Sequence, residues 1–137
     1  MMKAANLYEA VGGEPALRRL VDAYLEALES RPDVRPLRAL YPRSLAHYSE
    51  RMTEYLSGWL GGPPLYLQRH GVPMLRERHV AMPIGPGERD MWMKCMRDAI
   101  ERTVPQPDLR EKLERVFWRL ADSMRNRDES PPHSVAR

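Results

Sequence analysis

Five segments of this chain space their apolar residues like the buried face of an α-helix, and none shows the sustained alternation of β-branched residues that a strand requires. The clearest segment begins near Glu14-Pro15 and ends around Ser30. Its apolar side chains recur every three or four residues: Leu17, Leu20, Val21, Tyr24, Leu25 and Leu28. Because 137 residues suit one domain with one core, the pattern predicts a single all-α domain.

Proline, glycine and capping residues mark the bounds of the other four predicted helices. Proline is tolerated in the first turn of a helix, and glycine commonly follows the last turn. The first of the five helices is predicted to run from Asn6 to Gly12-Gly13, and the third from after Ser44 to Gly61-Gly62. The fourth is predicted to run from Pro86 to before Pro105, and the fifth from Asp108 to near Arg127.

Two parts of the chain lack helical periodicity. The segment from Pro63 to Pro86 is predicted to be a long loop, which is unusual in a compact domain and often functional. It contains two of the four histidines, His70 and His79. The polar residues 128–137 are predicted to form a disordered tail, which leaves residues 1–127 as the folded domain.

Composition narrows the class of protein. The net charge of +3 is spread along several predicted faces, so no basic stripe indicates nucleic-acid binding. The single cysteine, Cys95, allows no intrachain disulfide and fits a reducing compartment. There is no apolar run long enough to span a membrane and no apolar signal core at the start, so we expect a cytoplasmic protein.

Common catalytic motifs are missing from the sequence. We find no glycine-rich phosphate loop, no zinc-type pair of ligands and no plausible Ser-His-Asp set. What is left is a helical protein whose aromatic helix faces could enclose a flat apolar cofactor. The same faces also suit an ordinary core, so a helical interaction module without a cofactor is an alternative.

Several stretches nevertheless resemble the truncated haemoglobins of the second group. They are LYEAVGG at residues 7–13, LYP at 40–42, GGP at 61–63, MLRERH at 74–79 and PIGPGERDMWMKCM at 83–96. The resemblance spans about residues 6 to 127. It implies a globin-like, two-over-two helical sandwich around one haem b (iron protoporphyrin IX).

The resemblance also assigns roles to residues around the iron. His79 matches the proximal ligand, and a neutral imidazole is the usual axial ligand of a globin iron. Trp92 and Tyr41 match distal positions from which an indole N–H and a hydroxyl can donate to a bound ligand. Tyr48 and Met52 match further distal positions on the third predicted helix. Without the resemblance, these residues would be read as a surface histidine, core aromatics and a turn tyrosine.

Other residues are placed at the edge of the implied cofactor. Arg51 and Arg78 match positions that pair with haem propionates, and Tyr66 is a weaker candidate for the same edge; a guanidinium suits a carboxylate by its bidentate geometry. His47 shares a polar edge with Arg51, so we expect it near solvent or the haem edge. Its use as a sixth iron ligand is the minority alternative.

The chain departs from the family on the second predicted helix. The family usually has a Phe-Tyr pair there, whereas this chain has Tyr24-Leu25. An ungapped match places Leu25 toward the ligand and predicts the loss of one distal hydroxyl. In the competing register the helix is rotated, and Tyr24 supplies that hydroxyl.

The predicted activity is reversible binding of oxygen or another diatomic ligand, such as nitric oxide or carbon monoxide, at a histidine-ligated iron. The alternative is a haem redox enzyme, a nitric oxide dioxygenase or a peroxidase-like protein, that needs an unknown external reductase. A monomer and a homodimer both fit the sequence.

Overall fold

A computed structural model describes residues 7–74, 77, 79 and 82–128 of the chain. Every regular element of these residues is a helix, as the sequence predicts. The elements are α1 (Leu7–Val11), α2 (Gly13–Ser30), the 3-10 helix η2 (Pro32–Val34), α3 (Arg35–Arg38), α4 (Tyr48–Trp59), α5 (Leu65–His70), α7 (Pro86–Thr103) and α8 (Pro107–Ser123). Within the described residues, no helix is both long and apolar enough to cross a membrane.

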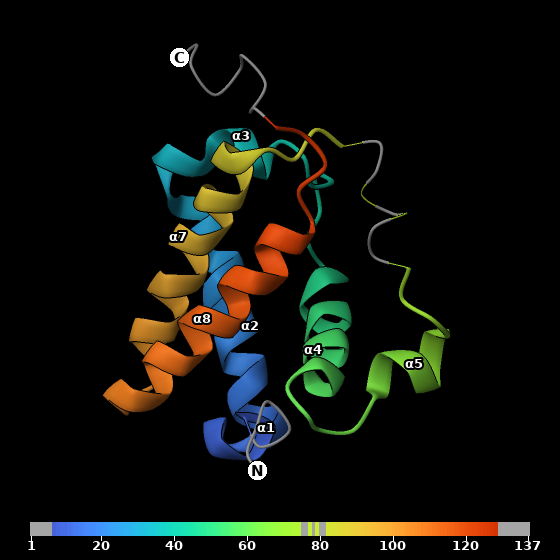
Figure 1. Ribbon diagram of the computed structural model, residues 1–137, viewed down its shortest axis with the longest axis vertical. Helices are drawn as coiled ribbons and strands as arrows, with labels where there is room; N and C mark the ends of the chain where they lie inside the picture. The colour runs from blue at the N-terminus through green and yellow to red at the C-terminus, as the bar shows by residue number, and fades with distance from the viewer. Residues whose placement is uncertain (1–6, 75–76, 78, 80–81, 129–137) are drawn as a thin grey trace.

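The four long helices form two packed pairs. Helix α2 contacts both α4 and α7, and α7 in turn contacts α8 (Figure 1). The pair α2–α4 therefore lies against the pair α7–α8, which is the two-over-two arrangement that the resemblance implies. Helix α5 stands outside these pairs, next to α4 (Figure 1).

The core lies where these pairs meet, and α2 supplies much of it. The predicted apolar stripe of α2 is buried as a whole, with Leu17, Leu20 and Tyr24 entirely inaccessible to solvent. Met96 and Ile100 of α7 and Leu113 and Phe117 of α8 are equally buried. Full burial of one such side chain contributes about 1.5–3 kcal/mol, so this shared core is what holds the pairs together.

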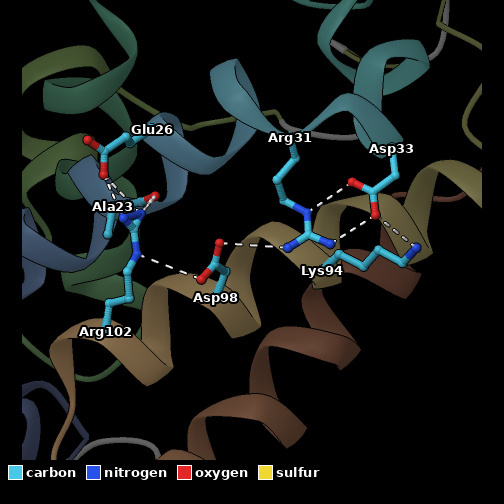
Figure 2. Close-up of polar contacts among 7 residues, drawn as sticks. All are labelled: Ala23, Glu26, Arg31, Asp33, Lys94, Asp98 and Arg102. Carbon is cyan, nitrogen blue, oxygen red and sulfur yellow. Dashed lines mark hydrogen bonds and ion pairs between the residues drawn. The ribbon is translucent and has the colours of Figure 1, made fainter.

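A row of charged side chains joins α2 and the turn after it to the outer face of α7 (Figure 2). Arg31 binds both carboxylate oxygens of Asp33, at 3.0 and 2.9 Å, and this contact does most to lower the pKa of Asp33 to about 2. Lys94 reaches the same carboxylate at 3.3 Å, and Arg102 reaches Glu26 at 2.6 Å. Since such half-exposed pairs are each worth at most about 1 kcal/mol, the row orients the helices more than it stabilises them.

The structure corrects the prediction for the segment from Pro63 to Pro86. Helix α5 forms within it, although six residues are too few to show periodicity. Tertiary contacts hold the helix: Arg69 and His70 bind the buried carboxylate of Glu54 on α4 at 2.8 and 2.7 Å. Burial raises the pKa of Glu54, but these two partners outweigh burial and hold that pKa below its ordinary value.

Two helix boundaries also differ from the prediction. Helix α4 begins at Tyr48 rather than after Ser44, because the Ser44 hydroxyl accepts the Ala46 N–H at 3.2 Å in a turn that precedes the helix. Helix α8 ends at Ser123 rather than near residue 127. The N–H groups of Asn126 and Arg127 instead donate to the carbonyl of Ile84. The predicted disordered tail falls, from residue 129 on, outside the described residues.

The glycine pair after α4 permits a close approach between the end of α4 and α1 at the start of the domain. A Cβ atom on Gly62 would overlap the base of the Tyr8 ring on α1, while the Tyr8 N–H donates to the Leu60 carbonyl at 3.0 Å. Glycine is therefore required at position 62 for steric reasons.

We predict that Gly62→Ala lowers the free energy of unfolding by about 1–3 kcal/mol, the usual cost of overpacking. Chemical denaturation measures this cost. In a Tyr8→Ala background, where the ring is gone, the same change should cost much less. Equal costs in both backgrounds would contradict the steric explanation.

Candidate functional site

An apolar cavity of about 470 Å³ opens between α4, α5, α7 and α8. This volume lies within the range of about 300–1,000 Å³ that is typical of small-molecule and cofactor sites. Seven of the nine residues predicted for the site line it: Tyr41, Tyr48, Arg51, Met52, Tyr66, His79 and Trp92. Of the other two, Arg78 lies outside the described residues, and Leu25 is not among the lining residues.

His79 lies in the segment that leads into α7, and its side chain is partly buried at the cavity wall. Its carbonyl accepts two hydrogen bonds, one from the Met82 N–H at 3.0 Å and one from the Asn126 side chain at 2.9 Å. A neutral imidazole is the usual axial ligand of a globin iron. Two imidazoles line the cavity, and that of His79 is partly buried whereas that of His47 is exposed.

Aromatic side chains from four parts of the chain, namely α2, the turn after α3, α4 and α7, gather at or behind another part of the wall. The Tyr24 and Tyr41 hydroxyl oxygens are 2.7 Å apart and share a hydrogen bond. The Tyr24 ring lies 5.5 Å from the Trp92 ring, and the Tyr41 ring lies 5.1 Å from the Tyr48 ring. The site thus offers hydroxyl groups and an indole N–H within one aromatic cluster.

Neither Tyr24 nor Leu25 is among the cavity-lining residues, but Tyr24 is connected to the cavity through Tyr41, which lines it. Tyr24 is fully buried and its hydroxyl reaches Tyr41, whereas Leu25 is 8% exposed and belongs to the apolar core. Adjacent residues on a helix point about 100° apart, so the burial of Tyr24 between α4 and α7 turns Leu25 toward a different part of the core.

Burial also sets the protonation state of the two tyrosines. Removal from water disfavours the charged phenolate, and this raises the pKa of Tyr41 to about 12 and that of Tyr24 well above its ordinary value. Both hydroxyls therefore keep their protons across the physiological range and can donate hydrogen bonds.

The rim of the cavity carries charged and polar side chains. Arg51 and His47 lie there and are exposed, which agrees with the expectation that His47 lies near the edge. Tyr66 of α5 is buried at the same cavity and stacks near His70, with ring centres 4.9 Å apart.

Sequence analysis missed two lining residues at the start of α7. Glu88 is buried, and its carboxylate accepts the Gly85 N–H at 2.9 Å, which caps the helix; a glutamate three residues after a helix boundary is a recognisable capping signal. Arg89 binds Asp122 at 2.8 Å and lies 5.1 Å over the Trp118 ring. No local signal reveals Arg89 as a lining residue, because two of its partners, Asp122 and Trp118, come from α8, and its contact to the neighbouring Asp90 says nothing of the cavity.

Two pairs of helices around an apolar cavity, with a histidine at its wall, are the features of a globin. A family model described as "Bacterial-like globin" matches residues 6–126. A group 2 truncated haemoglobin of Bacillus subtilis is 38% identical over 130 residues, which cover 93% of each chain.

Solved structures agree. The group II 2-on-2 haemoglobin of Agrobacterium tumefaciens superposes with a TM-score of 0.82 at 42% identity, covering 88% of this chain and 93% of that one. A structure described as the truncated oxygen-avid haemoglobin of Bacillus subtilis gives 0.77 at 38% identity, covering 88% and 98%. The chain belongs to the bacterial-like globin family, and within it to the group II truncated haemoglobins.

Membership of this family implies a haem cofactor, and the cavity fits one. Its wall is mostly apolar and aromatic, as a porphyrin face requires, and of its two imidazoles the partly buried one, His79, suits an iron. Two guanidinium groups at the same cavity, those of Arg51 and Arg89, suit the carboxylates of a porphyrin edge.

We predict that Tyr24 and Tyr41 ionise only at strongly alkaline pH, because burial raises both pKa values. Tyrosinate absorbance should show these two residues titrating later than exposed tyrosines, and Tyr24→Phe should remove one late transition. An unfolded tyrosine ionises near pH 10.0 while folded Tyr41 holds its proton to about 12. Folding stability should therefore fall as the pH rises from about 10 to 12. Normal titration of both residues would contradict their burial.

Proposed function

We propose that the cavity holds one non-covalent haem b with His79 as the axial iron ligand, and that the protein reversibly binds a diatomic ligand, oxygen foremost. The observation that carries this proposal is that one apolar cavity is lined both by an imidazole and by hydrogen-bond donors from an aromatic cluster. When bound, the haem supplies the iron at which a gas binds, and the protein tunes that binding.

Non-covalent attachment is supported by the position of the cysteine. Covalent c-type haem is attached through a C-x-x-C-H motif, whereas this chain has one cysteine, Cys95. Its side chain is buried in the core and is not among the cavity-lining residues. Burial also raises the pKa of its thiol to about 12.

The aromatic cluster supplies hydrogen bonds to a ligand that carries negative charge on its outer atom. The Tyr24 hydroxyl is buried beside Tyr41, and Tyr41 faces the cavity. If Tyr24 donates to the Tyr41 oxygen, the Tyr41 proton is left to donate toward the ligand, and both buried donors are satisfied. The indole N–H of Trp92 is a donor only, and it too can donate a hydrogen bond to the ligand.

Charged residues at the rim orient the porphyrin through its carboxylates. Arg51 is exposed at the cavity rim, so its guanidinium can turn toward a propionate. Arg89 is already held by Asp122 and offers a second, fixed positive charge. We also propose that Arg78 binds a propionate and that Tyr66 contacts the edge of the porphyrin.

Oxygen transport in the cytoplasm is the physiological role that we propose, as a monomer or a homodimer. The name of the oxygen-avid relative supports oxygen as the ligand. An external reductase is proposed to keep the iron ferrous.

We predict that His79→Ala abolishes the five-coordinate ferrous haem spectrum, because the cavity wall loses its axial imidazole. Absorption and resonance Raman spectra of the reconstituted protein measure this, through the iron–histidine stretching band. His47→Ala is the matched control, since His47 lies at the exposed rim, and it should retain the band. A normal band in His79→Ala would refute the ligand assignment.

We predict that Tyr24→Phe speeds oxygen release by about two-fold to ten-fold, the equivalent of one lost hydrogen bond of about 0.5–1.5 kcal/mol. Flash photolysis and stopped-flow mixing give this rate. Leu25→Tyr should leave the rate nearly unchanged, because position 25 faces the core. The reverse pattern would restore the register in which Leu25 faces the ligand.

A further inference from the structure

We propose that Asn126 is a positioning residue for His79: its side-chain amide holds the backbone that carries the imidazole and so fixes the imidazole's direction into the cavity. The inference rests on the proposed role of His79 as the iron ligand. Asn126 lies just beyond the end of α8, is partly buried, and is not itself a cavity-lining residue.

The Asn126 amide uses its full hydrogen-bonding capacity at this place. Its Nδ2 group donates to the carbonyls of His79 and Met82, both at 2.9 Å. Its Oδ1 atom accepts the Ile84 N–H at 3.0 Å and an Arg127 guanidinium N–H at 2.9 Å. Two carbonyls on one side and two donors on the other also fix the orientation of the amide group.

Backbone hydrogen bonds add to the attachment between the segment of residues 79–84 and the chain beyond α8. The N–H groups of Asn126 and Arg127 both donate to the Ile84 carbonyl, at 2.8 and 3.1 Å, and the Met82 N–H donates to the His79 carbonyl at 3.0 Å. Three cavity-lining residues, His79, Met82 and Ile84, are therefore tied to one residue of the chain beyond α8.

This attachment matters because residues 82–85 lie outside any helix. His79 itself has helical backbone, but residues 82–85 that follow it have no helical repeat to hold them, and a contact 47 residues away in sequence ties the His79 carbonyl to the chain beyond α8. Residues that orient a metal ligand are known to change metal affinity by about ten-fold to a hundred-fold when they are replaced. An asparagine is needed, because an aspartate of the same shape has no N–H to offer the two carbonyls.

The test uses the haem-reconstituted full chain with Asn126→Asp and Asn126→Ala. Two control variants separate positioning from general destabilisation. Ser123→Ala removes an exposed hydroxyl at the end of α8 that bonds only within its own turn, to the Leu120 carbonyl. Leu109→Ala removes a buried side chain at the start of α8, away from the cavity lining, and lowers stability by a core defect.

Three measurements are made on each protein: the iron–histidine stretching band of the ferrous form, the rate of haem transfer to an excess of an apoglobin acceptor, and amide hydrogen exchange at Ile84 in the haem-free protein. We expect both Asn126 variants to shift or broaden the band and to release haem about ten-fold faster or more. Exchange at Ile84 should be faster in Asn126→Ala, whereas Asn126→Asp keeps an acceptor for this N–H. Leu109→Ala should lower the melting temperature but keep the wild-type band.

An unchanged band and a haem transfer rate within two-fold of wild type in both Asn126 variants would overturn the proposal, even if their melting temperatures fall. If Asn126→Ala does not fold, Asn126→Asp decides by the same readouts. A band that survives in His79→Ala would instead refute the proposed function itself, so the two failures are told apart by which variant shows them.

Discussion

The apolar cavity is the constraint on which the other features of the structure depend. Close packing normally fixes the walls of a protein interior, but side chains that border a cavity have no other protein side chain facing them across it. Directional polar contacts take over this task around the cavity. The Tyr24–Tyr41 hydrogen bond, the Glu88 cap of α7 and the Asn126 contacts each join a wall residue, or the backbone beside it, to a different part of the chain.

The stabilising core and the cavity are neighbouring parts of the same two pairs of helices. The interface between α2, α7 and α8 is densely apolar, and its charged outer row orients the helices. The cavity lies to one side of this interface, between α7, α8 and the α4–α5 unit. The core and the cavity wall are continuous, because Leu120 and Ala121 of α8 belong to both, and the Trp92 ring of the wall lies 6.1 Å from the core ring of Phe117.

Local sequence patterns were sufficient to predict the long helices. They failed for side chains whose contacts come from residues far away in the sequence. The stripe of α2 predicted its burial, but two apolar neighbours, Tyr24 and Leu25, gave no periodic reason to choose between their registers. The polar partner of Tyr24 is the Tyr41 hydroxyl, 17 residues away, and no local pattern predicts that contact. Arg89 and Asn126 were missed for the same reason, and α5 was missed because its contacts to Glu54 are tertiary. His79 and Trp92 came from the family resemblance, which carries long-range information that a single pattern lacks.

The placement of Cys95 has a chemical consequence for a protein that handles reactive gases. Cys95 lies one helical turn beyond Trp92, a residue of the cavity wall, yet its thiol is enclosed by the core. Nucleophilic attack and oxidation proceed through the thiolate, and a thiol whose pKa is about 12 is almost entirely protonated at neutral pH. The sulfur atom therefore holds little reactive thiolate although it lies one helical turn from a residue of the cavity wall, and the single cysteine behaves as a small apolar side chain.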